Sequence, residues 1–272
     1  ADINSLHVRE ADEAVHIGGS RASESYLDIK KIIEAINKTG ADAVHPGYGF
    51  LSENTKFARA VKRAGAAFIG PSPEAIKAMG DKIESKKLAK EAGVSSVPGF
   101  LGVIPDAKEA VKIAKKSGYP VMIKASAGGG GKGMRIAWDD KEVLSGFKAS
   151  MSEAKSSFGD DRVFIEKYIT TPRHIEIQIL ADQHGHYLAL GERECSIQRR
   201  HQKVIEEAPS SFVDAKTRQK MYDQAKALAK KVGYYSAGTV EFIMDKDRNF
   251  YPKTHLGAVQ YHVYALSDLA HH

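Results

Sequence analysis

Cysteine is nearly absent from this sequence, since Cys195 is the only one among 272 residues. A single cysteine cannot form an internal disulfide, so we expect a reducing compartment. Long apolar runs are missing too, because no segment approaches the roughly 18 uninterrupted apolar residues that a membrane helix requires. Ala1–Asn4 also lacks the basic-then-apolar pattern of a signal peptide. We therefore expect a soluble intracellular protein.

Proline and glycine are present at ordinary levels, with 9 Pro and 24 Gly in a chain that is 42% hydrophobic and 27% charged. This composition excludes collagen-like, disordered and small disulfide-scaffold proteins. The length suffices for one large or two modest domains. Lys and Arg number 40 against 34 Asp and Glu, which gives a net charge of +6 and a pI near 9.1. That balance suits an anionic ligand such as a nucleotide but does not require nucleic acid.

Helix and strand patterns alternate through the first hundred residues. The helical stripe Leu27–Ile36 precedes the strand-like run 41–44, and a second unit pairs a helix at 56–64 with a strand at 66–70. Ser72–Pro73 then supplies a cap and a first-turn proline for another helix. Such repetition predicts a parallel sheet. The first residues lack an opening strand with a phosphate-facing turn, so we expect the chain to begin within a domain.

A second, lid-sized α+β module is expected from about residue 97 to 168. A helix from Asp106 leads to a strand at 121–124, and a glycine run separates it from a strand at 134–138, which predicts a hairpin. A helix at 142–157 and a strand at 163–166 complete the module. Farther on, strands are predicted at 174–179, 187–190 and 239–244, with an amphipathic helix between the last two.

The glycine flap, Gly128–Gly133, contains the spacing G-x-G-x-x-G. A helix would have to follow for dinucleotide binding, but the next residues read as a strand. A P-loop is also excluded, because Ser126 stands at the first glycine position and Gly133 follows Lys132 where Ser or Thr is needed. We interpret the segment as a loop whose backbone N–H groups and Lys132 contact a polyphosphate. The alternative is a mobile hairpin turn.

Two charged residues on predicted strands are candidates for ligand binding. Lys124 ends an apolar strand, where an ammonium is costly unless it meets an anion such as phosphate. The alternative is a lysine that extends from the sheet edge into solvent. Alternation places Glu241 with Thr239 and Ile243 on one face of its strand, where a carboxylate could hold Mg²⁺. A solvated strand face is the alternative reading of Glu241.

The segment Cys195–Lys203 is dense in hydrogen-bond donors and is expected to be a loop between strands that binds an anion. A nucleic-acid site is less favoured, because aromatic residues are not interleaved and Glu206–Glu207 follow. Cys195 suggests a nucleophile only because it is solitary. A buried structural thiol is the favoured interpretation.

A set of motifs stands in a specific order along the chain: His45–Asn54, Met79–Lys82, Lys124–Ala127 with the glycine flap, Glu166–Tyr168, Pro172–Glu176, Glu194–Lys203 and Ala237–Phe242. This set resembles the biotin carboxylase component of biotin-dependent carboxylases, a branch of the ATP-grasp superfamily. The resemblance covers residues 1 to about 251. The sequences of Ile136–Asp140 and Arg193–Ser196 most resemble the acyl-CoA carboxylases, in particular the propionyl-CoA carboxylases.

The resemblance implies a mixed α/β and α+β fold in three parts. Residues 1–96 would form a truncated Rossmann-like N-terminal domain that lacks its first βα unit. Residues 97–168 would form the ATP-grasp lid, and 169–272 an incomplete ATP-grasp C-terminal lobe with an atypical tail from 252.

The implied activity is the carboxylation of biotin on a carrier protein. ATP and bicarbonate give carboxyphosphate, and the CO₂ that it releases carboxylates N1 of biotin. The implied cofactors are ATP and Mg²⁺, with Mn²⁺ as an alternative metal and biotin as a carrier-bound substrate. The implied partners are bicarbonate, a biotin carboxyl carrier domain, a carboxyltransferase subunit and further copies of the intact protein, with no nucleic acid and no membrane. The bacterial cytoplasm or the mitochondrial matrix is the expected location.

Site residues carry over by motif. Lys82 and Lys124 would contact the ATP phosphates, and the flap, Gly128, Gly129, Gly130, Gly131, Lys132 and Gly133, would close over them. Glu166 and Lys167 would lie on the hinge strand that meets adenine, with His174 near the nucleotide. The catalytic loop would present Gln198, His201 and Lys203 to phosphate and bicarbonate, and Glu241 would bind Mg²⁺.

The chain departs from the family pattern after Tyr251. Thr254 stands where the resemblance implies a second metal-binding glutamate, and Ala258 where it implies a catalytic arginine. Neither side chain replaces the missing charge, so impaired activity is expected. A frameshifted reading frame, a trimmed sequence and a divergent gene remain open. The alternative function is a non-catalytic nucleotide-binding fragment or pseudo-enzyme, and carbamoyl phosphate synthetase is the alternative within the superfamily.

Overall fold

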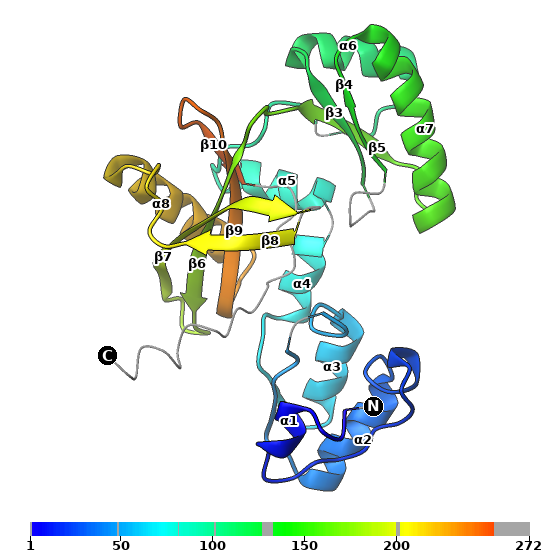
Figure 1. The fold of residues 1–272 in the computed structure, drawn as a ribbon, viewed down its shortest axis with the longest axis vertical. Coiled ribbons are helices and arrows are strands. Elements are labelled where there is room, and N and C mark those ends of the chain that lie inside the picture. Colours follow the sequence, from blue (N-terminus) through cyan, green and yellow to red (C-terminus); the bar gives the residue numbers. More distant parts are fainter. Residues whose placement is uncertain are drawn as a thin grey trace. The chain divides into compact units, whose positions relative to one another are not determined.

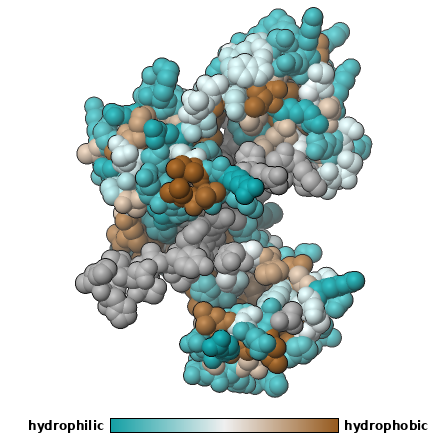
Figure 2. Space-filling model, viewed as in Figure 1, coloured by the Kyte–Doolittle hydropathy of each residue, from teal (hydrophilic) through white to brown (hydrophobic). Residues whose placement is uncertain are grey.

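The computed structural model describes residues 2–47, 49–80, 82–100, 102–126, 133–199 and 202–252. Within the described residues, the chain divides into two compact units, one that ends at Lys77 and one that begins at Ala78. Within the described ranges, every helix is too short or too polar to cross a membrane. On the face that Figure 2 presents, hydrophilic residues predominate and apolar side chains gather in separate small groups.

The first unit is built from short alternating elements, as its sequence predicts: α1 (Leu6–Arg9), a 3₁₀ turn (Ala22–Glu24), α2 (Ile29–Thr39), β1 (Ala43–Val44), α3 (Thr55–Arg63) and β2 (Ala67–Phe68), followed by α4 (Pro73–Gly80). The two strands pair in parallel, which confirms the βαβ interpretation. Asp28 and Asn54 cap α2 and α3 by accepting hydrogen bonds from backbone N–H groups. Phe57 and Val61 are the most deeply buried side chains of the apolar cluster between these helices.

The second unit contains α5 (Lys82–Glu91) and the segment 97–168 that is expected to form the lid, and we use the name lid for that segment. The lid elements are α6 (Ala107–Ser117), β3 (Val121–Ala125), β4 (Met134–Ala137), α7 (Asp140–Phe158) and β5 (Val163–Lys167). Their strands form an antiparallel sheet in the order β4-β3-β5, and both helices lie against one side of it (Figure 1). Val121 and Ile123 point into the core beneath those helices, so the alternate residues Met122 and Lys124 lie on the opposite face.

The hairpin predicted on either side of the glycine flap is confirmed. Strands β3 and β4 pair antiparallel, and the backbone N–H of Ala125 donates to the carbonyl of Gly133 at 2.9 Å. Gly133 has φ +70°, and a Cβ at that position would lie 2.7 Å from the Cβ of Ala125. A side chain there would be strained and in collision, so the loop must return through glycine. Gly128–Lys132 lie outside the described residues.

The remainder forms the C-terminal lobe. Its elements are β6 (Arg173–Ala181), β7 (Tyr187–Arg199), β8 (Gln202–Glu207), α8 (Ala215–Lys231), β9 (Ser236–Met244) and β10 (Phe250–Pro252). The strands are all antiparallel, in the order β10-β9-β6-β7-β8 (Figure 1). Helix α8 packs on β6 and β7. Alternation buries Ile175, Ile177 and Ile179 on one face of β6, which leaves the polar residues between them for the other.

Candidate active site

A row of charged residues crosses the polar face of the C-terminal lobe. Glu176, on the central strand β6, is paired in register with Glu241 on β9 and with Arg193 on β7. We call Arg193, Glu176 and Glu241 the charged row. Only 2% of the Glu176 side chain is exposed. The expected division of β9 is confirmed as well, because Val240, Phe242 and Met244 are buried on the face opposite Glu241. Strand pairing thus brings a basic and two acidic side chains together.

Lys203 joins the charged row from β8. Its Nζ donates to Oε2 of Glu176 and, at 3.0 Å, to Oε1 of Glu241. Burial by itself lowers the pKa of this ammonium, but the carboxylates of Glu241 and Glu176 outweigh burial and raise the pKa of Lys203. Lys203 is therefore a fixed cation at neutral pH. Two residues assigned separately from the sequence, Lys203 and Glu241, are in direct contact.

Arg193 contacts residues on three strands. Its Nε donates to Oε1 of Glu176 at 2.6 Å, and its two terminal nitrogens donate to Gln178 at 3.0 Å and to Thr239 at 3.3 Å. Its Nε also lies 3.5 Å from a carboxylate oxygen of Glu206. A planar guanidinium has donors in fixed directions, so several acceptors together determine its orientation. Arg193 therefore connects β6, β7, β8 and β9.

The expected loop at Cys195–Lys203 is wrong for the described residues. Strand β7 continues through Arg199 and strand β8 begins at Gln202, so the segment belongs to a hairpin. Inward and outward side chains do not alternate regularly along this segment, because the register of β7 against β8 shifts between Glu194 and Ile197 and again between Ile197 and Gln198. The amide of Gln198 donates to the carbonyl of Cys195 at 2.8 Å and so closes this bulge. His201 lies outside the described residues.

Lys124 is bound by an anion that belongs to the protein itself. Its ammonium donates to the carboxylate of Glu166 on β5, and both side chains are largely buried. Register explains the contact, because Lys124 is paired with Phe164 and Glu166 is two residues farther along. The alternative of a lysine extending into solvent is therefore wrong. The lid face opposite α6 and α7 carries both residues.

The three other predicted nucleotide contacts have different surroundings. Nζ of Lys167 donates to the carbonyls of Gly118 at 2.9 Å and Tyr119 at 2.5 Å, where α6 ends. Its side chain thus satisfies carbonyls that a helix end leaves unpaired. His174 is half-buried on β6, and its backbone N–H donates to Oγ of Ser196 at 3.1 Å. Lys82 begins α5, and the placement of its side chain is not described.

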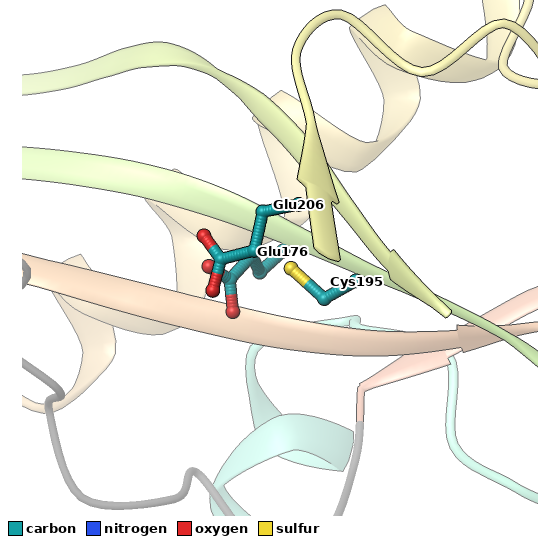
Figure 3. A group of neighbouring side chains, drawn as sticks. All are labelled: Glu176, Cys195 and Glu206. Carbon is teal, nitrogen blue, oxygen red and sulfur yellow. The ribbon is translucent and has the colours of Figure 1, made fainter. Parts of the chain in front are cut away.

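Glu176, Cys195 and Glu206 form a compact group whose ligand atoms all lie within 4.8 Å of one another. Figure 3 shows the sulfur of Cys195 turned toward the two carboxyl groups. Burial and the charge of Glu176 raise the pKa of Cys195 to about 12, so the thiol keeps its proton at neutral pH. Both oxygens of Glu176 already bind Arg193 and Lys203. The group does not fit a metal ion, and the interpretation of Cys195 as a buried, unreactive thiol is favoured.

Two family models match most of the chain, with residues 77–80 and those after Pro252 outside both matches. The model described as "Carbamoyl-phosphate synthase L chain, ATP binding domain" matches residues 81–252, and "Biotin carboxylase, N-terminal domain" matches residues 1–76. The chain is 66% identical over 251 residues to the propionyl-CoA carboxylase alpha chain of Ruegeria pomeroyi and 65% identical over 250 residues to the mitochondrial one of Homo sapiens.

The chain belongs to the biotin carboxylase family. Family members are ATP-dependent ligases, and the resemblance read from the motifs is confirmed. The two alignments cover 92% of this chain but only 37% and 34% of the relatives, so the chain spans about a third of their length.

Solved biotin carboxylase structures confirm the expected fold class. A Campylobacter jejuni biotin carboxylase in complex with β,γ-ATP matches with a TM-score of 0.87 at 47% identity. The biotin carboxylase domain of Hydrogenobacter thermophilus 2-oxoglutarate carboxylase, with MgADP and bicarbonate, matches with a TM-score of 0.83 at 47% identity. Each match covers 92% of this chain and 56% of the solved chain. The sheets of this chain's described residues are open.

Sequence reasoning missed Glu176, which contacts the predicted site residue Lys203, and Arg193, which contacts Glu176. The signal for Glu176 was present, because strict alternation from His174 to Ile179 places three polar side chains on one face of a strand. The signal for Arg193 was absent. Its contacts depend on the register of β7 against β6 and on the distance to Thr239, which one strand's pattern does not contain.

Proposed function

We propose that this chain provides the ATP- and bicarbonate-using site of a biotin carboxylase, which carboxylates biotin on a carrier domain through carboxyphosphate. The observation that carries the proposal is the contact of Lys203 with both Glu176 and Glu241. It gives the lobe a permanently charged ammonium beside a carboxylate of the kind that binds Mg²⁺. Phosphoryl transfer depends on cations placed around developing negative charge, so this combination suits the reaction.

Glu241 is the proposed Mg²⁺ ligand of this chain. Its carboxylate is largely buried and supplies the hard oxygen ligand that Mg²⁺ prefers. The ion would neutralise charge on the ATP phosphates. Mn²⁺ is the alternative metal.

Lys124 and Lys82 are the proposed phosphate contacts, together with the flap Gly128–Gly133. Lys124 supports this role because its ammonium already binds an anion, the Glu166 carboxylate. A phosphate group would take over that ammonium or share it with Glu166. For Lys167, whose Nζ is bound to carbonyls at the end of α6, we propose contact with adenine through the main chain. Glu166 and His174 complete the proposed nucleotide site.

Lys203, His201 and Gln198 are the proposed catalytic residues that bind bicarbonate and the phosphate released from ATP. A fixed ammonium at Lys203 would stabilise the negative charge of carboxyphosphate. The proposed partners are a biotin carboxyl carrier domain, a carboxyltransferase subunit and further copies of the protein. Propionyl-CoA is the proposed final acceptor, because the named relatives are propionyl-CoA carboxylase alpha chains. The bacterial cytoplasm or mitochondrial matrix is the proposed location.

A second candidate is nucleotide binding without turnover. The observation in its favour is Thr254 and Ala258, which stand where the family pattern has a glutamate and an arginine. Such a chain would retain Lys124 and Glu241 for MgATP but lack the charges that complete carboxylation.

Phosphate release from MgATP, measured with bicarbonate in the presence and absence of free biotin, tests both candidates. The control variants are Lys203→Met and Lys246→Met, since Lys246 is a lysine with 83% of its side chain exposed. Biotin-stimulated release that is lost in Lys203→Met and kept in Lys246→Met supports carboxylation. Calorimetric MgATP binding without turnover supports the second candidate. Neither binding nor turnover by a folded chain would contradict both.

A further inference from the structure

Arg193 and Lys203 bind opposite oxygens of one carboxylate. Nε of Arg193 donates to Oε1 of Glu176, and Nζ of Lys203 donates to Oε2. The Glu176 side chain is 2% exposed, so water contributes little to its solvation. Two cations therefore neutralise one buried carboxylate. If the carboxylate turns to suit one cation, the oxygen that binds the other cation moves as well.

Of these two cations, Arg193 is the one whose orientation is fixed by other residues. Its remaining donors bind Gln178 on β6 and Thr239 on β9. A guanidinium held at three points cannot rotate without breaking hydrogen bonds in a largely buried site. Lys203, by contrast, is a single ammonium on a flexible stem, and among the described residues its hydrogen bonds go to the carboxylates of Glu176 and Glu241. Arg193 thus fixes the orientation of the Glu176 carboxylate, and this carboxylate in turn fixes the position of the Lys203 ammonium.

We propose that Arg193 is a positioning residue that acts through Glu176 to hold the Lys203 ammonium where the substrate anion binds. The role rests on the proposed function, which assigns Lys203 to bicarbonate and phosphate. Without Arg193, the Glu176 carboxylate keeps one cation and is free to turn. Lys203 then follows Glu176 or moves toward Glu241, and the anion loses a preorganised partner.

The chain offers a matched control for a purely structural role. Arg218 on α8 donates through Nε to the carboxylate of Glu192 at 2.8 Å, and the Glu192 side chain is also 2% exposed. Glu192 precedes Arg193 on β7, and its carboxylate also binds Tyr222 and Ser210. Arg218→Met and Arg193→Met each remove a guanidinium from a buried glutamate, but only Arg193 shares its glutamate with Lys203.

The first measurement is the side-chain ammonium spectrum of the full chain labelled with ¹⁵N-lysine. Two carboxylates protect the Lys203 ammonium from exchange with water, so its signal is expected to be visible and is identified by its loss in Lys203→Met. Arg193→Met is expected to shift or abolish the signal, and Arg218→Met to leave it unchanged. Arg193→Lys preserves a cation at Glu176, so it serves as the test variant if Arg193→Met fails to fold. It is expected to shift the Lys203 signal by less than Arg193→Met does. No Lys203 signal in the wild type, or an unchanged one in the Arg193 variants, overturns the proposal.

The second measurement is binding of inorganic phosphate in the presence of MgADP, followed by titration. Arg193→Met is expected to weaken phosphate binding about fivefold, the ratio for a coupling near 1 kcal/mol between residues in one network. The double variant Arg193→Met with Lys203→Met is expected to bind phosphate as weakly as Lys203→Met alone. Arg218→Met is expected to bind phosphate as tightly as the wild type. Equal losses in the two arginine variants contradict positioning. A shifted Lys203 signal with no phosphate binding by the wild type supports positioning and contradicts the proposed function instead.

Discussion

The ammonium of Lys124 and the carboxylate of Glu166 form an ion pair with only 12% and 4% of the two side chains exposed. The pair joins strands β3 and β5 on the lid face proposed to meet the nucleotide. Removing one partner from a buried pair costs more than the pair contributes, because the remaining buried charge loses its counter-ion where little water reaches it.

The Lys124→Met variant is expected to lower the free energy of unfolding by about 3–5 kcal/mol, because the buried Glu166 carboxylate loses its cation. Urea unfolding followed by circular dichroism measures the change. Lys112→Met is the matched control, since Lys112 forms an ion pair with Glu109 at 2.9 Å but has 74% of its side chain exposed. The control is expected to leave the free energy of unfolding nearly unchanged, because water screens an exposed ion pair. Equal effects of the two variants would contradict a buried, tightly coupled pair.

Glu192 predicts an acid-sensitive contribution to stability. Burial alone raises the pKa of its carboxyl group, but hydrogen bonds from Arg218 and Tyr222 outweigh burial and lower the pKa below its ordinary value. A depressed carboxyl pKa stabilises the folded state above the unfolded pKa, about 4.3, and this stabilisation is lost as the pH falls through the folded pKa. Unfolding free energies measured in urea from about pH 7 to pH 3 are expected to fall less steeply in Glu192→Gln than in the wild type. Parallel curves would show that Glu192 does not contribute.

Cys195 is expected to be unreactive in the folded chain. The thiolate is the reactive form, and a pKa of about 12 leaves almost none of it at neutral pH. Dithionitrobenzoate is therefore expected to label the native chain at the rate of unfolding and to label the urea-unfolded chain at once. The Cys195→Ala variant reports the background. Rapid labelling of the folded chain would contradict the favoured interpretation of a buried structural thiol.

Local patterns predicted the secondary structure where a regular period or a capping residue was present. The helix expected at 142–157 is α7, Asp140–Phe158, and the expected face of Glu241 is confirmed. The glycine run between two strand patterns also predicted the hairpin of β3 and β4.

Pairing between strands accounts for what the sequence did not predict. The segment Cys195–Lys203 reads as a loop because two register shifts interrupt its alternation, although Cys195–Arg199 continues β7. Glu166 as the partner of Lys124, and Arg193 as the partner of Glu176, require the registers of β3 with β5 and of β6 with β7. A single strand's period places a side chain on a face but does not say which strand lies beside it.

The position of β8 at the end of the sheet order gives Lys203 and Glu176 different local stabilities. In the described part of the lobe, β6 is paired on both sides, whereas β8 is paired with β7. Edge strands open at a lower free energy than central strands, which exchange their amide hydrogens only when the whole sheet opens. Lys203 therefore stands on the strand whose amide hydrogens are expected to exchange first, whereas Glu176 and Glu241 stand on strands that are paired on both sides. Local opening of β8 would separate the ammonium from both carboxylates while the strands that carry the carboxylates stay paired.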